Sequence, residues 1–164
     1  ILVAAISICF IATITNAQVP PAGKYNTTNY LKDRKEIALL NAIRDSSKYL
    51  NDDYISVGAE GRVYYGKSEE DKSFNKYGLK FKSVTPVKGT EVLRVYNGNA
   101  ALHNVVYNVL FSSSKGDLHV KVIRSTAYIK ENGKWYIAFG QGTEVHTDAE
   151  MEAAMQKNLK KKFE

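Results

Sequence analysis

The chain has 164 residues, of which 44% are hydrophobic and 24% are charged, and its formal net charge is +6. This size and composition predict one globular domain with a proper core and exclude a disordered chain. The basic residues are mostly scattered among acids, which disfavours a nucleic-acid-binding protein, because such a protein gathers its charge on one face among aromatic side chains.

Residues 1–17 form an uncharged and almost wholly apolar segment that ends in Thr15-Asn16-Ala17. Small or polar residues before a cut after Ala17 are typical of a secretory signal peptide, here without its basic start, so we expect the chain to begin inside the signal. An uncleaved membrane anchor is the alternative, although the apolar run is shorter than the roughly 20 residues that span a bilayer. We expect a periplasmic or secreted protein, with no stable membrane insertion after cleavage.

The only cysteine, Cys9, lies inside this segment. The mature chain would therefore contain no disulfide, no cysteine nucleophile and no thiolate metal site. No His-x-His or histidine–carboxylate spacing indicates a metal site of another kind, and we expect neither a metal nor a cofactor.

Residues 18–27 contain two prolines and are expected to form an extended linker. A helical pattern begins near Thr27 and Thr28, either of which can act as its N-cap. Asp45 is expected to cap a short second helix at 46–50, with one continuous helix over the whole stretch as the alternative. The apolar stripe of the first helix consists of Leu31, Ile37, Leu40 and Ile43.

Alternating apolar and aromatic residues predict strands through most of the remaining chain. Asn97-Gly98 and Asn132-Gly133 are dipeptides that accept positive φ at both central positions of a tight hairpin turn. Pro86 and Gly89 predict a bend between two strands, and a polar helix is expected at 68–75. The strands are expected at 54–57, 62–65, 79–87, 90–96, 100–111, 118–130 and 134–145.

A capping box at Thr147-Asp148-Ala149-Glu150 predicts a C-terminal helix at 148–164. Its methionine stripe, Met151 and Met155, is expected to pack against the domain, with docking on a partner as the alternative. Long strands twist and curl around a covering helix. We therefore predict an α+β fold over residues 28–147, a cone in which a curved antiparallel sheet wraps around the N-terminal helix and leaves a central pocket.

Short motifs occur in a fixed order along the chain: 50–58, 61–68, 124–128, the Gly-x-Trp hairpin 132–137, and 141–143. Together they resemble SnoaL-like domains (of the DUF4440 type) in the nuclear transport factor 2-like superfamily. The resemblance implies a cone-shaped cystatin-like fold, a pocket between helix and sheet, and a homodimer formed through the outer sheet face. It implies no single activity, since such domains include isomerases, dehydratases, hydrolases and binding modules. Gln141 stands where many relatives have a histidine.

His103 is the best catalytic candidate, because it shares a strand face with Val105, Tyr107 and Val109. A neutral imidazole there can serve as a general base. The alternative is a satisfied structural histidine on an apolar face.

Arg124 shares a strand face with Thr126 and Tyr128, so its charge must be paired or line a cavity. It is expected to bind a carboxylate or another polar head group, and an internal salt bridge with Asp53 or Glu144 is the alternative. The other candidate ligand-binding residues are Tyr54, Phe74, Tyr77, Tyr107, Tyr128, Trp135 and Gln141.

These residues predict a domain that binds a small apolar or amphipathic molecule, with no assigned reaction. One alternative is a cofactor-independent isomerase or hydrolase that uses His103 as base, with Arg124 or Tyr107 stabilising charge. Another is a homodimeric assembly module with no catalytic role. No acidic residue occupies an interior strand position in the expected sheet, which lowers the expectation of an enzyme.

Overall fold

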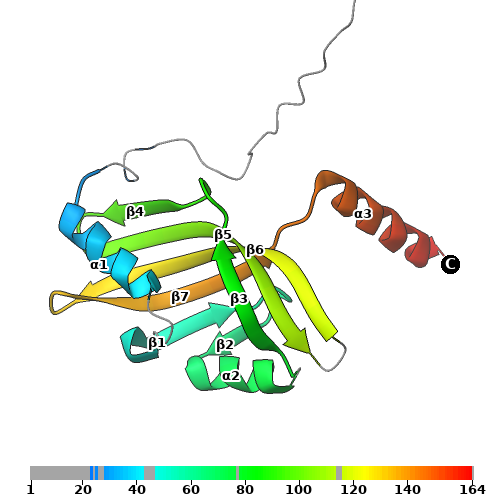
Figure 1. Cartoon of the computed structure of the whole chain (residues 1–164), viewed down its shortest axis with the longest axis horizontal. Coiled ribbons are helices and arrows are strands. Elements are labelled where there is room, and N and C mark those ends of the chain that lie inside the picture. Colours follow the sequence, from blue (N-terminus) through cyan, green and yellow to red (C-terminus); the bar gives the residue numbers. More distant parts are fainter. Residues whose placement is uncertain are drawn as a thin grey trace, which may run out of the picture.

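The structure is a computed structural model (Figure 1), and the residues it describes are 23, 25, 28–42, 47–76, 78–113 and 116–163. The expected signal peptide, most of the linker, and Tyr77 lie outside this part. Within it, no helix is long and apolar enough to cross a membrane.

The described residues form an α+β fold, as predicted, in which helices accompany one curved sheet. In chain order the elements are α1 (Leu31–Ala42), the 3₁₀ turn η1 (Ser47–Tyr49), β1 (Leu50–Val57), β2 (Val63–Tyr65), α2 (Lys67–Lys76), β3 (Lys80–Pro86), β4 (Val92–Tyr96), β5 (Ala100–Ser113), β6 (Gly116–Glu131), β7 (Lys134–Glu144) and α3 (Asp148–Phe163).

The sheet has the strand order β2-β1-β7-β6-β5-β3, and β4 also pairs with β5. β3 pairs with the second half of β5 and β4 with the first half, so the two form one bent edge. The bend lies between Pro86 and Val92 and contains Gly89 at φ +82°, as the sequence predicts. β1 runs parallel to β7, whereas the other pairs are antiparallel.

Both Asn-Gly turns have the predicted geometry. Asn97 and Gly98 have φ values of +51° and +71°, and Asn132 and Gly133 have +50° and +77°. Positive φ at both central residues matches the twist of the flanking strands. These turns set the β4–β5 and β6–β7 hairpins.

The first helix begins at Leu31, so the expected start at Thr27 or Thr28 is wrong. The Arg34 side chain holds the preceding segment instead. Its guanidinium donates to the backbone carbonyls of Asn29 at 2.6 Å, Tyr25 at 2.9 Å and Leu93 at 2.7 Å. These bonds tie α1 and the chain before it to β4.

The expected short second helix is present as a 3₁₀ turn at Ser47–Tyr49, whereas Leu50 belongs to a strand; the expected cap Asp45 and Ile43 lie outside the described residues. The structure has one turn of 3₁₀ helix, and β1 then begins at Leu50, four residues before the predicted strand. Leu50 pairs with Ile137 of β7 and packs against the core. Tertiary packing thus extends the strand through Asn51-Asp52-Asp53, whose polar side chains predict a break.

α1 covers one end of the concave side of the sheet, called the inner face below (Figure 1). Asp33 of α1 anchors it there, since its Oδ1 accepts from Trp135 Nε1 at 3.1 Å and from Lys130 Nζ at 2.6 Å. Burial alone would raise the pKa of Asp33, but these two donors lower it overall. The core beneath consists of Ile37, Leu40, Tyr54, Val95, Ala101, Tyr128, Trp135 and Ile137.

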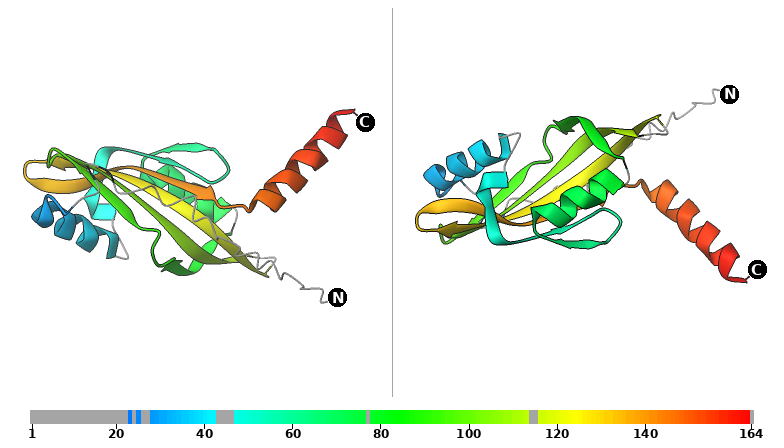
Figure 2. Two further views of the ribbon diagram at one scale, coloured as in Figure 1. Left: turned by 90° about the horizontal axis from the view of Figure 1, so that it is seen from above. Right: turned by 90° about the horizontal axis from the view of Figure 1, so that it is seen from below.

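The C-terminal helix has the predicted capping box. Glu150 Oε2 accepts from the Thr147 amide at 2.7 Å, and the Glu150 amide donates to Thr147 Oγ1 at 3.3 Å. Figure 2 shows α3 projecting away from the sheet. The expected packing of its methionine stripe is wrong, because Met151 is 53% exposed and Met155 is 64% exposed.

Candidate functional site

Strand register brings four inner-face residues from four strands into one row. His103 of β5 lies opposite Thr126 of β6, Thr126 lies opposite Gly140 of β7, and Gly140 lies opposite Ser56 of β1. His103, Thr126 and Ser56 are all buried. Arg124 lies in the next row on the same face. The predicted placement of His103 and Arg124 on one face is therefore correct.

Gly140 leaves the space in which two of the candidate residues meet. A Cβ atom at this position would lie 2.7 Å from Arg124 Nη2 and 3.0 Å from the Tyr54 hydroxyl. The guanidinium and the phenol therefore both extend over the glycine. Glycine in a strand interior marks such a close approach. We call Ser56, Arg124, Gly140 and Tyr54 the head-group site.

The Ser56 hydroxyl is a buried polar group without a hydrogen bond. Its side chain is in a residue only 2% exposed, and Oγ has no hydrogen-bond partner among the described atoms. It lies close enough to the Tyr54 hydroxyl to act as a donor toward it, which opposes the rise that burial causes in the pKa of Tyr54. The two groups do not meet hydrogen-bond geometry. Because buried polar groups nearly always have partners, this hydroxyl calls for a ligand or an ordered water.

Arg124 makes no salt bridge within the described part of the chain. The expected alternative, a pair with Asp53 or Glu144, is wrong. Asp53 is exposed, and Glu144 Oε2 lies 3.8 Å from His146 Nε2 instead. The guanidinium is thus a half-buried cation without a carboxylate partner there.

Three tyrosines surround this cation. Burial raises the pKa of Tyr54, Tyr107 and Tyr128, and Arg124 opposes the rise in all three. The negative charge of Glu70 adds to the rise at Tyr54, and that of Glu91 adds to the rise at Tyr107. All three phenols therefore stay protonated near neutral pH and can donate hydrogen bonds.

His103 is 3% exposed and has a partner at each ring nitrogen. Asn41 Nδ2 of α1 lies 3.2 Å from Nδ1, and Glu91 Oε1 lies 2.9 Å from Nε2. The Tyr128 hydroxyl donates to Asn41 Oδ1. His103 is thus a satisfied structural histidine at rest, and it can act as a base only if Asn41 moves away.

Gln141 lies on the opposite face of the sheet from Arg124. It pairs with Ser125 and Val57, and its amide lies 3.2 Å from Thr143 Oγ1. The cause is a bulge in β7 near Ala138, where the register shifts by one residue. Simple alternation from Trp135 would have placed Gln141 inside.

Two further candidates lie away from the head-group site. Trp135 is part of the core, where its indole N–H is bound to Asp33. Phe74 of α2 packs on Phe81 and Phe111, with ring centroids 5.2 Å and 6.4 Å away. Val105 of β5 lies opposite Arg124, and Phe111 is six residues farther along the same strand. The distance along β5 between Val105 and Phe111 is therefore about 20 Å.

The sequence reasoning missed Asn41, Ser56, Glu91 and Gly140. Two glycines at Gly140 and Gly142, inside a long strand, are the signal that a sequence reading could have used. The others acquire meaning only from contacts between distant elements.

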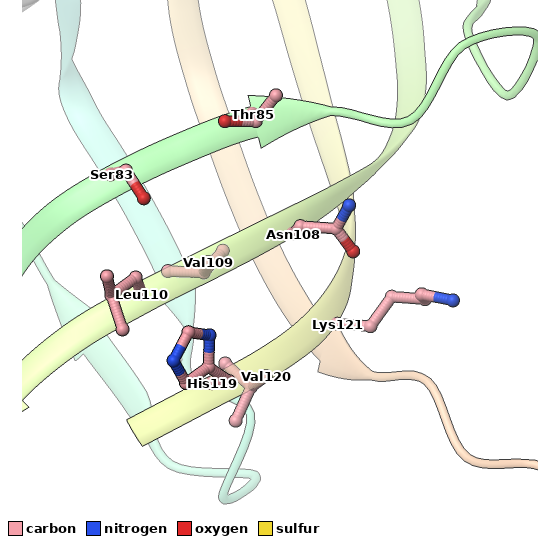
Figure 3. A pocket seen from close by; sticks show the side chains of 8 residues that line it. All are labelled: Ser83, Thr85, Asn108, Val109, Leu110, His119, Val120 and Lys121. Carbon is pink, nitrogen blue, oxygen red and sulfur yellow. The ribbon is translucent and has the colours of Figure 1, made fainter. Parts of the chain in front are cut away.

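The outer face carries a groove of about 330 Å³ across three strands (Figure 3). Six of its eight lining residues form two cross-strand rows, and all of these except Leu110 are exposed. The rows are Ser83, Leu110 and His119, and Thr85, Asn108 and Lys121. A second hollow of about 410 Å³ lies beside α1 and η1 and includes Leu39, Tyr49 and Trp135. Neither contains Arg124.

The described residues include no group of three or more histidine, cysteine, aspartate or glutamate side chains placed to hold a metal ion. The sequence matches no family model and no curated protein.

Solved structures do match the fold. A Caulobacter vibrioides protein with a cystatin-like fold gives a TM-score of 0.58 at 16% identity, covering 77% of this chain and 99% of its own. A nuclear transport factor 2-like protein of unknown function from Prochlorococcus gives 0.57 at 14% identity, with 72% and 97% covered. The chain has the nuclear transport factor 2-like fold.

An enzyme shares this nuclear transport factor 2-like fold. A type 2 hexachlorocyclohexane dehydrochlorinase (LinA) gives a TM-score of 0.59 at 13% identity, covering 71% of this chain and 87% of its own. Identities this low establish the fold alone, so function must be argued from the site.

Proposed function

We propose that the chain binds a small amphipathic molecule on its inner face, with an anionic head group held at Arg124. The observation that carries the proposal is the pair of unsatisfied groups at Gly140. Arg124 has no carboxylate partner among the described residues, and the Ser56 hydroxyl beside it has no hydrogen bond. A carboxylate would satisfy both groups.

The donors at this site suit a carboxylate. A guanidinium presents a planar fork of N–H groups to two carboxylate oxygens. The Tyr54 and Ser56 hydroxyls add two neutral donors on the same side. The apolar body of the ligand would extend along β5, over Tyr107 and Val109, toward the Phe74–Phe111 ring contact. We therefore expect an alkyl or aryl carboxylate.

Calorimetry with octanoate tests this proposal. The protein should bind octanoate, Arg124→Met should weaken the binding strongly, and Arg124→Lys should retain more of it because the charge remains. Lys121→Met on the outer face is the matched control and should bind as the native protein does. Equal loss in both methionine variants would contradict an inner site.

We also propose that the chain is a SnoaL-like domain, that it is exported, and that it forms a homodimer. The ordered motifs support a SnoaL-like domain, and the apolar segment at 1–17 supports export to the periplasm or beyond. Half-buried apolar side chains on the outer face, among them Ile123, Ile129 and Phe139, support a homodimer. Sedimentation velocity of the mature chain tests the dimer, and a monomer at all concentrations would exclude it.

One observation favours a second candidate, a proton-transferring enzyme. The Glu91 carboxylate at His103 Nε2 would stabilise an imidazolium, as expected for a general base. Such an enzyme should exchange the α-protons of bound 2-octanone with D₂O, and His103→Gln should stop the exchange. Exchange at the buffer rate would exclude this activity for ketones.

A further inference from the structure

A chain of polar contacts links the protein surface to the head-group site. It starts at Glu91, whose side chain is 65% exposed, and continues through His103 and Asn41 to the Tyr128 hydroxyl. Thr126 follows, since its hydroxyl is close enough to lower the pKa of Tyr128 against the larger effect of burial. Thr126 lies directly opposite Gly140.

The direction of each hydrogen bond in this chain is fixed by its chemistry. Asn41 Nδ2 can only donate, so His103 Nδ1 accepts and carries no proton. Nε2 then carries the proton and donates to Glu91. Asn41 Oδ1 can only accept, so the Tyr128 hydroxyl donates toward α1 and away from the head-group site.

Protonation of His103 is incompatible with this arrangement. A second N–H at Nδ1 would face the Asn41 Nδ2 donor, and two donors repel. Rotation of the Asn41 amide by half a turn resolves the conflict, because Oδ1 then accepts from Nδ1. Asn41 Nδ2 then faces Tyr128, so the Tyr128 oxygen must accept from it. The Tyr128 O–H bond turns toward Thr126 and Gly140, and the phenol stays protonated.

We propose that this series of polar contacts makes the head-group site pH-sensitive. Protonation of His103 reverses the hydrogen bonds. The reversal presents one additional donor, through Tyr128 and Thr126, to the bound carboxylate. The inference rests on the proposed function for the identity of the ligand. The reversal itself is a property of the free protein.

The charged and titratable groups around His103 come from several elements. Glu91, which precedes β4, is the anion at Nε2, and Arg124 of β6 is a cation in the neighbouring row. Tyr107 of β5 and Tyr128 of β6 are neutral phenols. From α1 the partner is the uncharged Asn41. His103 is the imidazole in this set, the side-chain type that ordinarily responds to pH in the physiological range.

The first test uses the protein without ligand. NMR with ¹⁵N-labelled histidine and ¹³Cζ-labelled tyrosine follows the His103 ring and Tyr128 during a pH titration. The Tyr128 ¹³Cζ signal should shift with the same midpoint as the His103 ring, while the phenol itself stays protonated. In Asn41→Leu, which removes the link, the Tyr128 response should disappear. A Tyr128 signal that ignores His103 in the native protein would overturn the proposal.

Asn41→Asp gives a second variant with the opposite expectation. An aspartate can accept from both Tyr128 and protonated His103, so no reversal is needed. The His103 midpoint should rise by about one pH unit or more, because an opposite charge stabilises the cation. Tyr128 should no longer follow it. An unshifted His103 midpoint would contradict the contact between Asn41 and His103, on which the series of polar contacts depends.

The second test measures octanoate affinity between about pH 5.5 and 8. Affinity should be about tenfold higher below the His103 midpoint, the usual effect of one hydrogen bond to a charged group. The dependence should vanish in Asn41→Leu and persist in His119→Asn and His146→Asn. If octanoate binds with an affinity that does not depend on pH, the proposed reversal of the hydrogen bonds is wrong and the proposed binding site is retained. If octanoate does not bind but the Tyr128 signal shifts with the His103 midpoint, the proposed function is wrong and the reversal of the hydrogen bonds is retained.

Discussion

The inner head-group site and the outer groove are built by the same strands and differ in burial. Each has a cross-strand arrangement with hydroxyls, a histidine and one cation, Arg124 inside and Lys121 outside. The groove is a hollow of about 330 Å³, and its exposed polar side chains are open to water. Inside, a buried hydroxyl has no hydrogen bond and a guanidinium has no carboxylate partner in the described part of the chain. Unsatisfied buried groups therefore identify the site better than the hollow does.

The largest difference between the two regions should appear on removing their cations. Arg124→Met should weaken octanoate binding about a hundredfold, or about 2.7 kcal/mol, because it removes a charge-assisted bidentate contact. Lys121→Met should change it less than about twofold. Calorimetry of both variants measures the octanoate affinity. A larger loss of affinity in Lys121→Met would contradict binding at the inner site.

Gly140→Ala should weaken binding about tenfold without unfolding the protein. The new Cβ would displace the end of the flexible Arg124 side chain and would lie 3.0 Å from the hydroxyl of the buried Tyr54. Gly142→Ala is the matched control, since its Cβ would meet only Val122 Cγ1 at 3.3 Å. Thermal denaturation should give nearly the same midpoint for both variants. Equal affinities would show that the space over Gly140 is not used.

The inner face depends on α1, whereas the outer groove does not. Asp33→Asn should lower the free energy of unfolding by about 1 kcal/mol at pH 7, because the ionic contact with Lys130 is lost. The folded pKa of Asp33 lies below its ordinary 3.8, so this stabilisation is present above that value and is lost as pH falls through the folded pKa. Urea unfolding at pH 7 and at low pH should show the difference between native protein and variant shrinking in acid. A difference that grows in acid would contradict this assignment.

Ser56→Ala should have the smallest effect on binding and an unusual signature. Affinity for octanoate should fall about threefold, while stability stays equal or rises because an unsatisfied buried hydroxyl is removed. Ser125→Ala on the outer face is the matched control. Its hydroxyl accepts from Asn104 Nδ2 at 2.7 Å, so this variant should lose stability and keep its affinity. Loss of stability in Ser56→Ala would show that the hydroxyl already has a partner.

Local patterns predicted the fold well. The Asn-Gly turns, the strand alternation and the Pro86–Gly89 bend are properties of neighbouring residues, and the structure confirms them. The same alternation correctly placed His103 and Arg124 on one face. Resemblance to a family added the correct fold, although it gave no reaction.

The parts of the site that were missed depend on contacts between distant segments. The meeting of Ser56 with Gly140 needs a parallel pairing of β1 with β7, which no local pattern encodes. Gln141 was misplaced because the β7 bulge shifts the alternation by one residue. Asn41 and Glu91 are ordinary polar residues until α1 and the segment before β4 bring them to His103.

The most direct test of the inner site is a crystal of the protein with 4-bromophenylacetate, in which anomalous scattering locates the bromine. The carboxylate should lie against Arg124 and Ser56 over Gly140, with the aryl group directed along β5. A probe found only in the outer groove, between His119 and Lys121, would contradict it.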